Sequence, residues 1–114
     1  MPRGSEALTN ARKEEIVNAC AALYETMSFK DITLQNIGKK TSFTRTSIYN
    51  YFHTKEEIFL ALLKREHDAW ITDMEELLQR NSSMDAQTFS EDMAKILEKR
   101  SCMLKLMSMN LSLI

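Results

Sequence analysis

The sequence predicts an all-α fold, and both composition and spacing support it. The 114-residue chain has two glycines and one proline, and the proline is residue 2, so little in it would interrupt a helix. Leu, Lys, Glu, Met, Ala and Ile dominate, which favours helices over strands. Apolar residues recur at intervals of three and four, as on a helix with one buried face. We expect one domain and part of a second.

Residues 1–10 are predicted to form a disordered arm, and the first helix to run from about Ala11 to Met27. One apolar stripe along this helix is predicted to face the core: Ile16, Cys20, Leu23, Tyr24 and Met27. The segment from Ser28 to Ile32 breaks the pattern. We expect Phe29 and Ile32 to anchor this loop in the core.

Two short helices should follow. Thr33 is a good N-cap because its hydroxyl can accept a hydrogen bond from a first-turn N–H, and it precedes a helix over about Leu34–Lys40. Thr41-Ser42-Phe43 is predicted as a turn, and Thr44 as the cap of a third helix over about Arg45–Tyr51. Two short helices joined by such a turn form a helix-turn-helix, a unit that places its second helix in a DNA major groove.

A long helix is predicted next. Thr54-Lys55-Glu56-Glu57 has the pattern of a capping box, in which Thr54 caps the Glu57 N–H and the Glu57 side chain reaches back. The helix should run from about Lys55 to Arg80. Apolar residues mark its inner face: Ile58, Phe59, Leu62, Leu63, Trp70, Leu77 and Leu78. After a polar break, a fifth helix is expected over about Met84–Arg100, with Phe89, Met93, Ile96 and Leu97 on one side.

The last segment, residues 101–114, has a different pattern. Nine of its 14 residues are apolar, and they fall all round a helical wheel. A helix that is apolar on every face is buried in a larger core or in an interface. We expect either that the sequence is the front part of a longer protein or that a partner subunit buries this helix. With Lys105 and Asn110 inside it, the segment is too short and too polar to span a membrane.

The net charge of −1 is unevenly distributed along the chain. Residues 1–65 hold ten Lys/Arg and seven Asp/Glu, whereas residues 66–114 hold five and nine. The front half would therefore suit a phosphate-bearing partner. No signal peptide and no apolar run of 18 residues is present, so we expect a cytoplasmic protein without a membrane span.

Catalytic and metal-binding patterns are missing from the sequence. Cys20 and Cys102 have no further Cys/His cluster beside them, so neither a disulfide framework nor a metal site is expected. There is no Gly-rich phosphate loop, no paired carboxylate site and no Ser/His/Asp arrangement. We therefore expect neither an enzyme nor a bound cofactor.

The predicted third helix carries side chains of the types that read DNA bases. In a major groove, Arg45 can pair bidentately with guanine and Asn50 with adenine. Thr46 and Ser47 can bond to either purine or touch a thymine methyl. Gln35, near the start of the second helix, can reach a phosphate or a base. These residues are the candidate base-reading set.

A second set is expected at the DNA backbone. Tyr49 and Tyr51 lie two residues apart on a helix, so they cannot both point inward, and their hydroxyls suit phosphate contact. Thr33, Thr44 and Lys55 lie at the starts of helices, where backbone N–H groups help to bind anions.

Residues 11–70 resemble the DNA-binding domain of the tetracycline-repressor (TetR) family of transcriptional regulators. The family has a string like Ala-Gly-Val-Ser-x-Gly-Thr-Leu-Tyr-x-Tyr-Phe-x-x-Lys-Glu, and residues 41–56 read Thr-Ser-Phe-Thr-Arg-Thr-Ser-Ile-Tyr-Asn-Tyr-Phe-His-Thr-Lys-Glu in register. The Tyr-x-Tyr-Phe-x-x-Lys-Glu part is the specific portion. Two positions depart from the family: the turn glycine is Ser42, and Thr46 replaces a glycine of the third helix.

The resemblance implies roles for the same residues and for the rest of the chain. It implies that bases are read by Gln35, Arg45, Thr46, Ser47 and Asn50, and that phosphates are held by Thr33, Thr44, Tyr49, Tyr51 and Lys55. The helix-turn-helix then lies at about residues 33–52. Residues 71–114 are expected to begin a truncated helical effector and dimerisation domain, joined to the DNA-binding domain by the long fourth helix.

The expected function is that of a ligand-responsive transcriptional repressor. The resemblance implies a homodimer that binds a palindromic double-stranded DNA operator and releases it when a small-molecule effector binds. The alternative is a helical protein-interaction module that keeps the same scaffold without binding DNA. The acidic back half and the apolar last segment favour that alternative.

Overall fold

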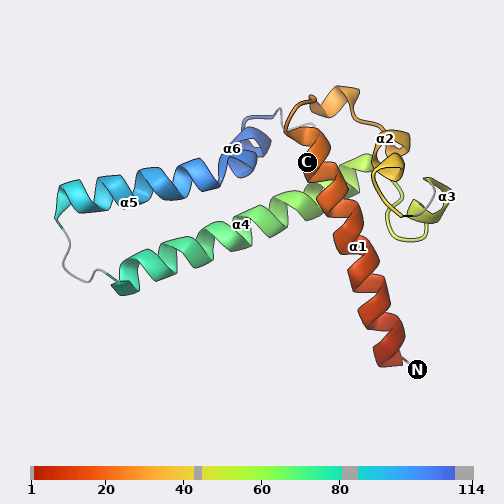
Figure 1. Ribbon diagram of the computed structural model, residues 1–114, viewed down its shortest axis with the longest axis horizontal. Helices are drawn as coiled ribbons and strands as arrows, with labels where there is room; N and C mark the ends of the chain where they lie inside the picture. The colour runs from red at the N-terminus through yellow and green to blue at the C-terminus, as the bar shows by residue number, and fades with distance from the viewer. Residues whose placement is uncertain (1, 43–44, 81–84, 110–114) are drawn as a thin grey trace. The chain divides into compact units, whose positions relative to one another are not determined.

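The computed structural model describes the backbone of residues 2–42, 45–80 and 85–109, and the side chains of these residues except 2–5 and 45–46 (Figure 1). Throughout this described part, the regular elements are helices and none is a strand, which confirms the all-α prediction. The elements are α1 (Pro2–Tyr24), a 3-10 helix η1 (Phe29–Asp31), α2 (Leu34–Lys39), α3 (Arg45–Ile48), α4 (Lys55–Arg80), α5 (Ala86–Lys99) and α6 (Ser101–Met107). They form two compact units, Met1–Leu62 and Leu63–Ile114, and α4 continues from the first into the second.

The first helix begins nine residues earlier than the sequence analysis places it. The arm expected to be disordered over residues 1–10 is helical from Pro2 onward. Proline suits the first helical position because its fixed φ is already helical and its missing N–H would have no helical partner there. Glu6, Ala7 and Leu8 are good helix formers, and the helix continues on both sides of them through residues of low propensity such as Gly4 and Asn10. At the other end, α1 finishes at Tyr24 and the chain turns through Met27, whose N–H donates to the Leu23 carbonyl over 2.9 Å.

The core of the first unit is built from apolar residues of all four of its α-helices. The fully buried side chains are Ile16 and Cys20 of α1, Ile32, Ile37 of α2, Ile48 of α3, and Ile58, Phe59 and Leu62 of α4. Phe59 lies at the centre of an aromatic cluster, with its ring 5.2 Å from that of Tyr24 and 4.8 Å from that of Phe29, both edge-to-face. The loop between α1 and α2 is thus anchored by Phe29 and Ile32, as predicted.

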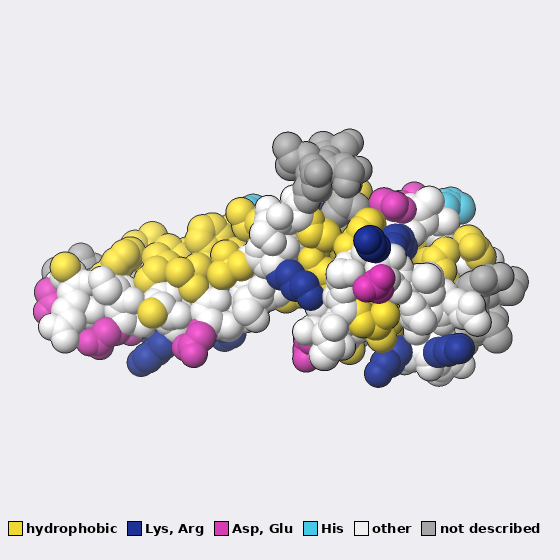
Figure 2. Space-filling view, turned by 90° about the horizontal axis from the view of Figure 1, so that it is seen from above, with side chains coloured by type: hydrophobic (Ala, Val, Ile, Leu, Met, Phe, Trp, Pro, Cys, Tyr) yellow, Lys and Arg dark blue, Asp and Glu magenta, His cyan; other side chains and the backbone are white. Residues whose placement is uncertain are grey.

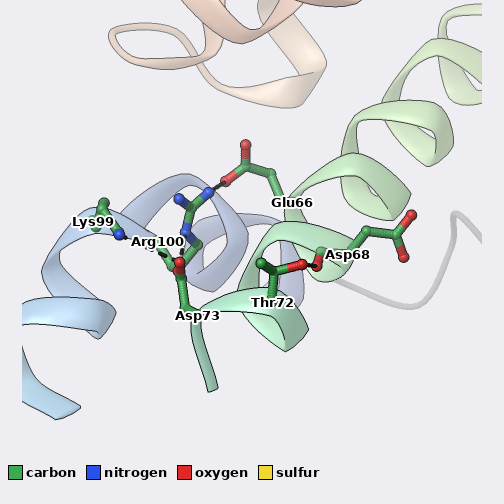
Figure 3. A network of polar contacts seen from close by, with 6 residues as sticks. All are labelled: Glu66, Asp68, Thr72, Asp73, Lys99 and Arg100. Carbon is green, nitrogen blue, oxygen red and sulfur yellow. Dashed lines mark hydrogen bonds and ion pairs between the residues drawn. The ribbon is translucent and has the colours of Figure 1, made fainter. Parts of the chain in front are cut away.

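The second unit pairs the rest of α4 with α5, which runs antiparallel to it (Figure 1). Polar contacts join the two helices near the α5–α6 junction (Figure 3). Arg100, the residue between α5 and α6, donates through Nε to Oδ2 of Asp73 over 2.9 Å, and its Nη1 lies 3.6 Å from Oε1 of Glu66. Lys99 Nζ lies 3.3 Å from the other Asp73 oxygen. The apolar residues Leu77, Ile96, Met103 and Leu106 are buried.

Several apolar side chains of the second unit are exposed instead of buried. Figure 2 shows hydrophobic side chains gathered along one edge of the arm formed by α4 and α5. Leu78, predicted on the inner face of α4, is 61% exposed, so that prediction is wrong. Residues of this unit that are more than a third exposed include Ile71, Phe89, Leu97, Leu104 and Met107. The all-round apolar segment is thus helical and buried on one side as far as Met107, and residues 110–114 lie outside the described part.

None of the helices in the described part of the chain is both long enough and apolar enough to cross a membrane.

Candidate nucleic-acid interface

The start of α2 is fixed by a reciprocal cap. The Thr33 Oγ1 accepts from the Asn36 N–H over 3.1 Å, and the Asn36 Oδ1 accepts from the Thr33 N–H over 2.9 Å. The Thr33 hydroxyl also donates to the same amide oxygen, over 2.9 Å. The predicted N-cap is confirmed, with Asn36 as its unpredicted partner. Gln35, one of the candidate base-reading residues, lies in the first turn and is exposed.

The third helix is shorter than predicted, but its hydrogen-bonded spiral continues beyond Ile48. The N–H of Asn50 donates to the Ser47 carbonyl over 3.1 Å, and the N–H groups of Tyr51 and Phe52 both donate to the Ile48 carbonyl, over 2.8 and 3.0 Å. Bonds to the third preceding residue tighten the last turn, so α3 ends at Ile48 instead of Tyr51. Fully buried Ile48 fixes this element to the core.

Exposure along this segment differs between neighbours. Tyr49 is 44% exposed and Asn50 is exposed, whereas Ser47 and Tyr51 are half-buried. The two tyrosines therefore do not share one environment, as expected for residues two apart. Of the other candidates, Arg45 and Thr46 are the first two residues of α3, with side chains outside the described part, and Thr44 lies outside it altogether.

The turn between α2 and α3 is tied to α1 by a contact that the sequence analysis missed. The backbone N–H of Ser42 donates to Oε2 of Glu15 over 2.7 Å, and the Ser42 hydroxyl donates to Oε1 over 3.2 Å. The two residues are 27 positions apart, and no spacing rule links them. Ser42 replaces the family's turn glycine, yet its φ is not positive, so the turn needs no glycine here.

The side chain of Lys55 is directed into the first unit. Its Nζ donates to the carbonyl of Phe29 over 2.7 Å and to that of Ile32 over 2.8 Å. It also lies 4.3 Å from the centre of the Phe29 ring, within the range of a cation–π contact. An ammonium has three N–H donors, so one is left for the phosphate contact predicted for this residue.

The start of α4 carries most of the predicted capping box. The Glu57 N–H donates to Thr54 Oγ1 over 3.2 Å, and the Glu57 carboxylate reaches back, but to the His53 N–H, over 2.6 Å. The carboxylate thus accepts one residue earlier than the usual box requires. The His53 backbone N–H lowers the pKa of Glu57, because that hydrogen bond favours the charged carboxylate, and the Thr54 N–H and the nearby His53 ring add to the effect.

Together these contacts hold α2, α3 and the start of α4 as one small assembly. Each junction is fixed by a different device: a reciprocal cap at Thr33, the Glu15 carboxylate at Ser42, and the Lys55 ammonium at the η1 segment. The short helices α2 and α3 are joined by a turn, and buried Ile48 anchors α3 to the core. This is the arrangement of a helix-turn-helix. Within the described residues, no group of His, Cys, Asp and Glu side chains is placed to hold a metal ion.

Comparison with known proteins identifies the domain. Residues 13–62 match the family model for "Bacterial regulatory proteins, tetR family". This segment is a TetR-family DNA-binding domain. Neither a search of curated proteins nor one of solved structures found a match to the chain. The TetR-family match ends where the first compact unit ends, at residue 62, so the family's domain and the first unit share their boundary. The chain thus carries the DNA-binding domain of a transcriptional regulator family.

Proposed function

We propose that this protein is a ligand-responsive, dimeric transcriptional repressor that binds a palindromic DNA operator. The observation that carries the proposal is the α2–turn–α3 assembly, in which the TetR-family match coincides with exposed Tyr49 and Asn50 beside a buried Ile48. An anchored element with exposed hydrogen-bonding groups meets the requirement for reading a groove.

The bases are read, in this proposal, from α3 and the first turn of α2. Asn50 has an exposed amide, which can donate to and accept from adenine at once, and Gln35 has a second exposed amide on α2. Arg45, Thr46 and Ser47 complete the set on α3. The exposed amides are the first positions to test, because truncating either one leaves the buried core untouched.

The DNA backbone is held by residues at the edges of the assembly. Tyr49 is the stronger tyrosine candidate because it is the more exposed of the two, and Tyr51 is the weaker. Thr44 stays a candidate at the start of α3. The Lys55 ammonium keeps its third N–H for a phosphate. The backbone N–H and the hydroxyl of Thr33 both donate to Asn36, so a phosphate contact by Thr33 requires its hydroxyl to turn away from Asn36, and Thr33 is the weaker candidate.

Dimerisation and effector binding are assigned to the part of the protein beyond the TetR-family match. The exposed apolar side chains of α4, α5 and α6 are suited to burial against further protein. A two-fold dimer would present two copies of α3 to successive major grooves, which requires an inverted repeat in the operator. An effector that prefers one spacing of the two copies would release the DNA. Because the proposed partners of the protein are DNA and a small-molecule effector, we propose that it acts in the cytoplasm.

The deciding experiment is selection of bound duplexes from a random DNA pool with the longest available form of the protein. An enriched inverted repeat is expected, and Asn50→Ala should cost about 1–3 kcal/mol of binding at one defined base position in each half-site. Gln79→Ala is the matched control, since it removes an exposed amide of α4 outside the TetR-family match. A folded, dimeric protein that enriches no sequence at low salt would contradict the proposal.

The second candidate is a helical protein-interaction module. Its supporting observation is the set of exposed apolar residues on the second unit, including Leu78 and Met107. It predicts a stable complex with a protein partner whose affinity is unchanged by Arg45→Ala and Asn50→Ala. If the same substitutions abolish both DNA binding and the complex, this candidate fails.

A further inference from the structure

We propose that Glu15 is a positioning residue for DNA recognition: its carboxylate, bound to Ser42, holds the turn from which α3 leaves. The inference rests on the proposed DNA-binding function and adds to it a residue that neither the family resemblance nor the base-reading set includes. Glu15 has no role in contacting DNA here. It acts through Ser42, three residues before the first residue of α3.

The backbone leaves its helical hydrogen bonding at Ser42. The N–H groups of Lys40 and Thr41 still donate back into α2, over 3.0 Å to Ile37 and 3.1 Å to Gly38, and the Thr41 hydroxyl donates to the Gly38 carbonyl over 2.8 Å. The next N–H, that of Ser42, donates to Glu15 instead. A backbone N–H that leaves a helix needs another acceptor, and here a side chain from α1 supplies it.

The helix that carries the Glu15 carboxylate is anchored in the core. Glu15 precedes fully buried Ile16 on α1, and Cys20, one turn further along, is also fully buried. A carboxylate attached to such an anchored helix can fix the position of what it binds. It takes two hydrogen bonds from one residue, through separate oxygens, and charge-assisted bonds of this kind are roughly twice as strong as neutral ones.

Serine also explains how the turn can do without the family's glycine. The Ser42 hydroxyl provides the second bond to Glu15, at 3.2 Å, which a glycine has no atom to make. With φ outside the positive range, the backbone does not need the freedom of glycine either. In this chain, therefore, Ser42 is held by its contact with Glu15 of α1, whereas the family pattern has a conformationally free glycine at this position.

If Glu15 positions the turn, removing its charge should weaken DNA binding, whereas a simple charge effect would strengthen it. A carboxylate on a DNA-binding unit repels phosphate, so neutralising it would strengthen binding if charge alone mattered. If Glu15 positions the turn, neutralising or truncating it must weaken binding. The salt dependence should stay unchanged, because the number of phosphates contacted is the same.

The first arm of the test measures operator affinity at several salt concentrations for Glu15→Ala and Glu15→Gln. Glu15→Ala should weaken binding roughly tenfold with an unchanged salt slope, and Glu15→Gln, which keeps one oxygen acceptor, should weaken it less. Glu25→Gln is the control, because it removes the same charge from an exposed residue of the same unit. Equal or stronger binding by both Glu15 variants would overturn the proposal.

The pair itself is tested by a double-mutant cycle. Ser42→Gly removes the hydroxyl contact and restores the family's residue, and it should weaken binding less than Glu15→Ala, because the N–H contact survives. In the double variant, the effect should be smaller than the sum of the two single effects. Additive effects would mean that Glu15 does not act through the Ser42 hydroxyl; the contact with the Ser42 N–H, which Ser42→Gly leaves in place, is tested by hydrogen exchange.

The second arm needs no DNA. Amide hydrogen exchange should become at least about tenfold faster at Ser42 in Glu15→Ala, while the amide of Ile37, which donates within α2, keeps its protection. Unchanged exchange at Ser42 would show that the contact does not hold the turn. A wild-type protein that binds no duplex would overturn the proposed function, and with it the role in recognition, whereas the exchange result would still show whether Glu15 fixes the turn.

Discussion

Arg100 and Asp73 form an ion pair that is largely shielded from solvent, with Nε of the arginine 2.9 Å from Oδ2 of the aspartate and side-chain exposures of 17% and 10%. Glu66, 14% exposed, lies on the other side of the guanidinium (Figure 3). Because Arg100 stands where α5 ends and α6 begins, the pair ties that junction to α4 within the second unit. The Arg100 guanidinium is thus the main positive charge beside the shielded carboxylates of Asp73 and Glu66.

Replacing Arg100 should therefore be costly. We expect Arg100→Met to lower the free energy of unfolding by about 2–4 kcal/mol, because it leaves two shielded carboxylates without their main partner. Urea denaturation would measure the change. The matched control is Lys99→Met, since Lys99 also contacts Asp73 but is 58% exposed, and its loss should cost at most about 1 kcal/mol. Equal effects of the two substitutions would contradict the assignment.

Lys55 should matter for stability independently of DNA. Lys55→Met keeps much of the aliphatic stem but removes both hydrogen bonds to the Phe29 and Ile32 carbonyls, so we expect a loss of about 1–3 kcal/mol. Thermal unfolding of the DNA-free protein would measure it. Glu56→Met, next in the chain and exposed, is the control and should change stability by less than about 0.5 kcal/mol. If Lys55→Met weakens DNA binding with no loss of stability, the residue serves mainly as a phosphate ligand.

Glu57 gives a prediction for the acid side of the stability profile. Its pKa is lowered from the ordinary 4.5, chiefly by the His53 N–H, so the folded state holds the proton less tightly than the unfolded state. The stabilisation is therefore complete above the unfolded pKa and is lost as the pH falls through the lower, folded value. Glu57→Gln should lose this stabilisation at neutral pH and show a shallower decline in stability below pH 4.5. Unfolding midpoints measured from neutral pH to about pH 3 would show whether the two profiles converge in acid, as expected.

Phe59 is the residue whose truncation should most damage the first unit. It is fully buried and contacts the rings of both Tyr24 and Phe29, so Phe59→Ala should cost about 3–5 kcal/mol. Chemical denaturation would measure this, and Phe59→Leu should cost less because more of the volume is retained. Leu60→Ala is the control at a neighbouring position, where the side chain is 43% exposed. A similar cost at both positions would rule out a special role for the aromatic cluster.

Local signals explain which parts of the fold could be predicted from the sequence. The bounds of α4 were predicted residue for residue, because Thr54 and Glu57 mark its start and a sustained apolar period follows. The Thr33 cap was likewise visible in the sequence, since its partner is three residues away. The early start of α1 was missed because residues 2–10 have no apolar period and include Gly4, Thr9 and Asn10, which have low helix propensities.

Contacts between distant residues explain what was missed at the candidate site. Nothing in the neighbourhood of Glu15 shows that its acceptor oxygens face Ser42, and nothing around Lys55 shows that two carbonyls of the preceding loop bind its ammonium. The sequence could identify which residue types suit DNA. It could not show which of their hydrogen-bonding groups are already used inside the protein, because that depends on how the helices pack.

The two compact units meet inside an unbroken helix, not in a linker, since α4 runs from Lys55 to Arg80 and the boundary lies at Leu62. One residue inserted after Leu62 would turn every later side chain of α4 by about 100° around the helix axis, whereas seven residues, close to two full turns, would nearly restore the original facing. For an insertion made of good helix formers, the number of inserted residues would therefore set the direction in which the later α4 side chains face.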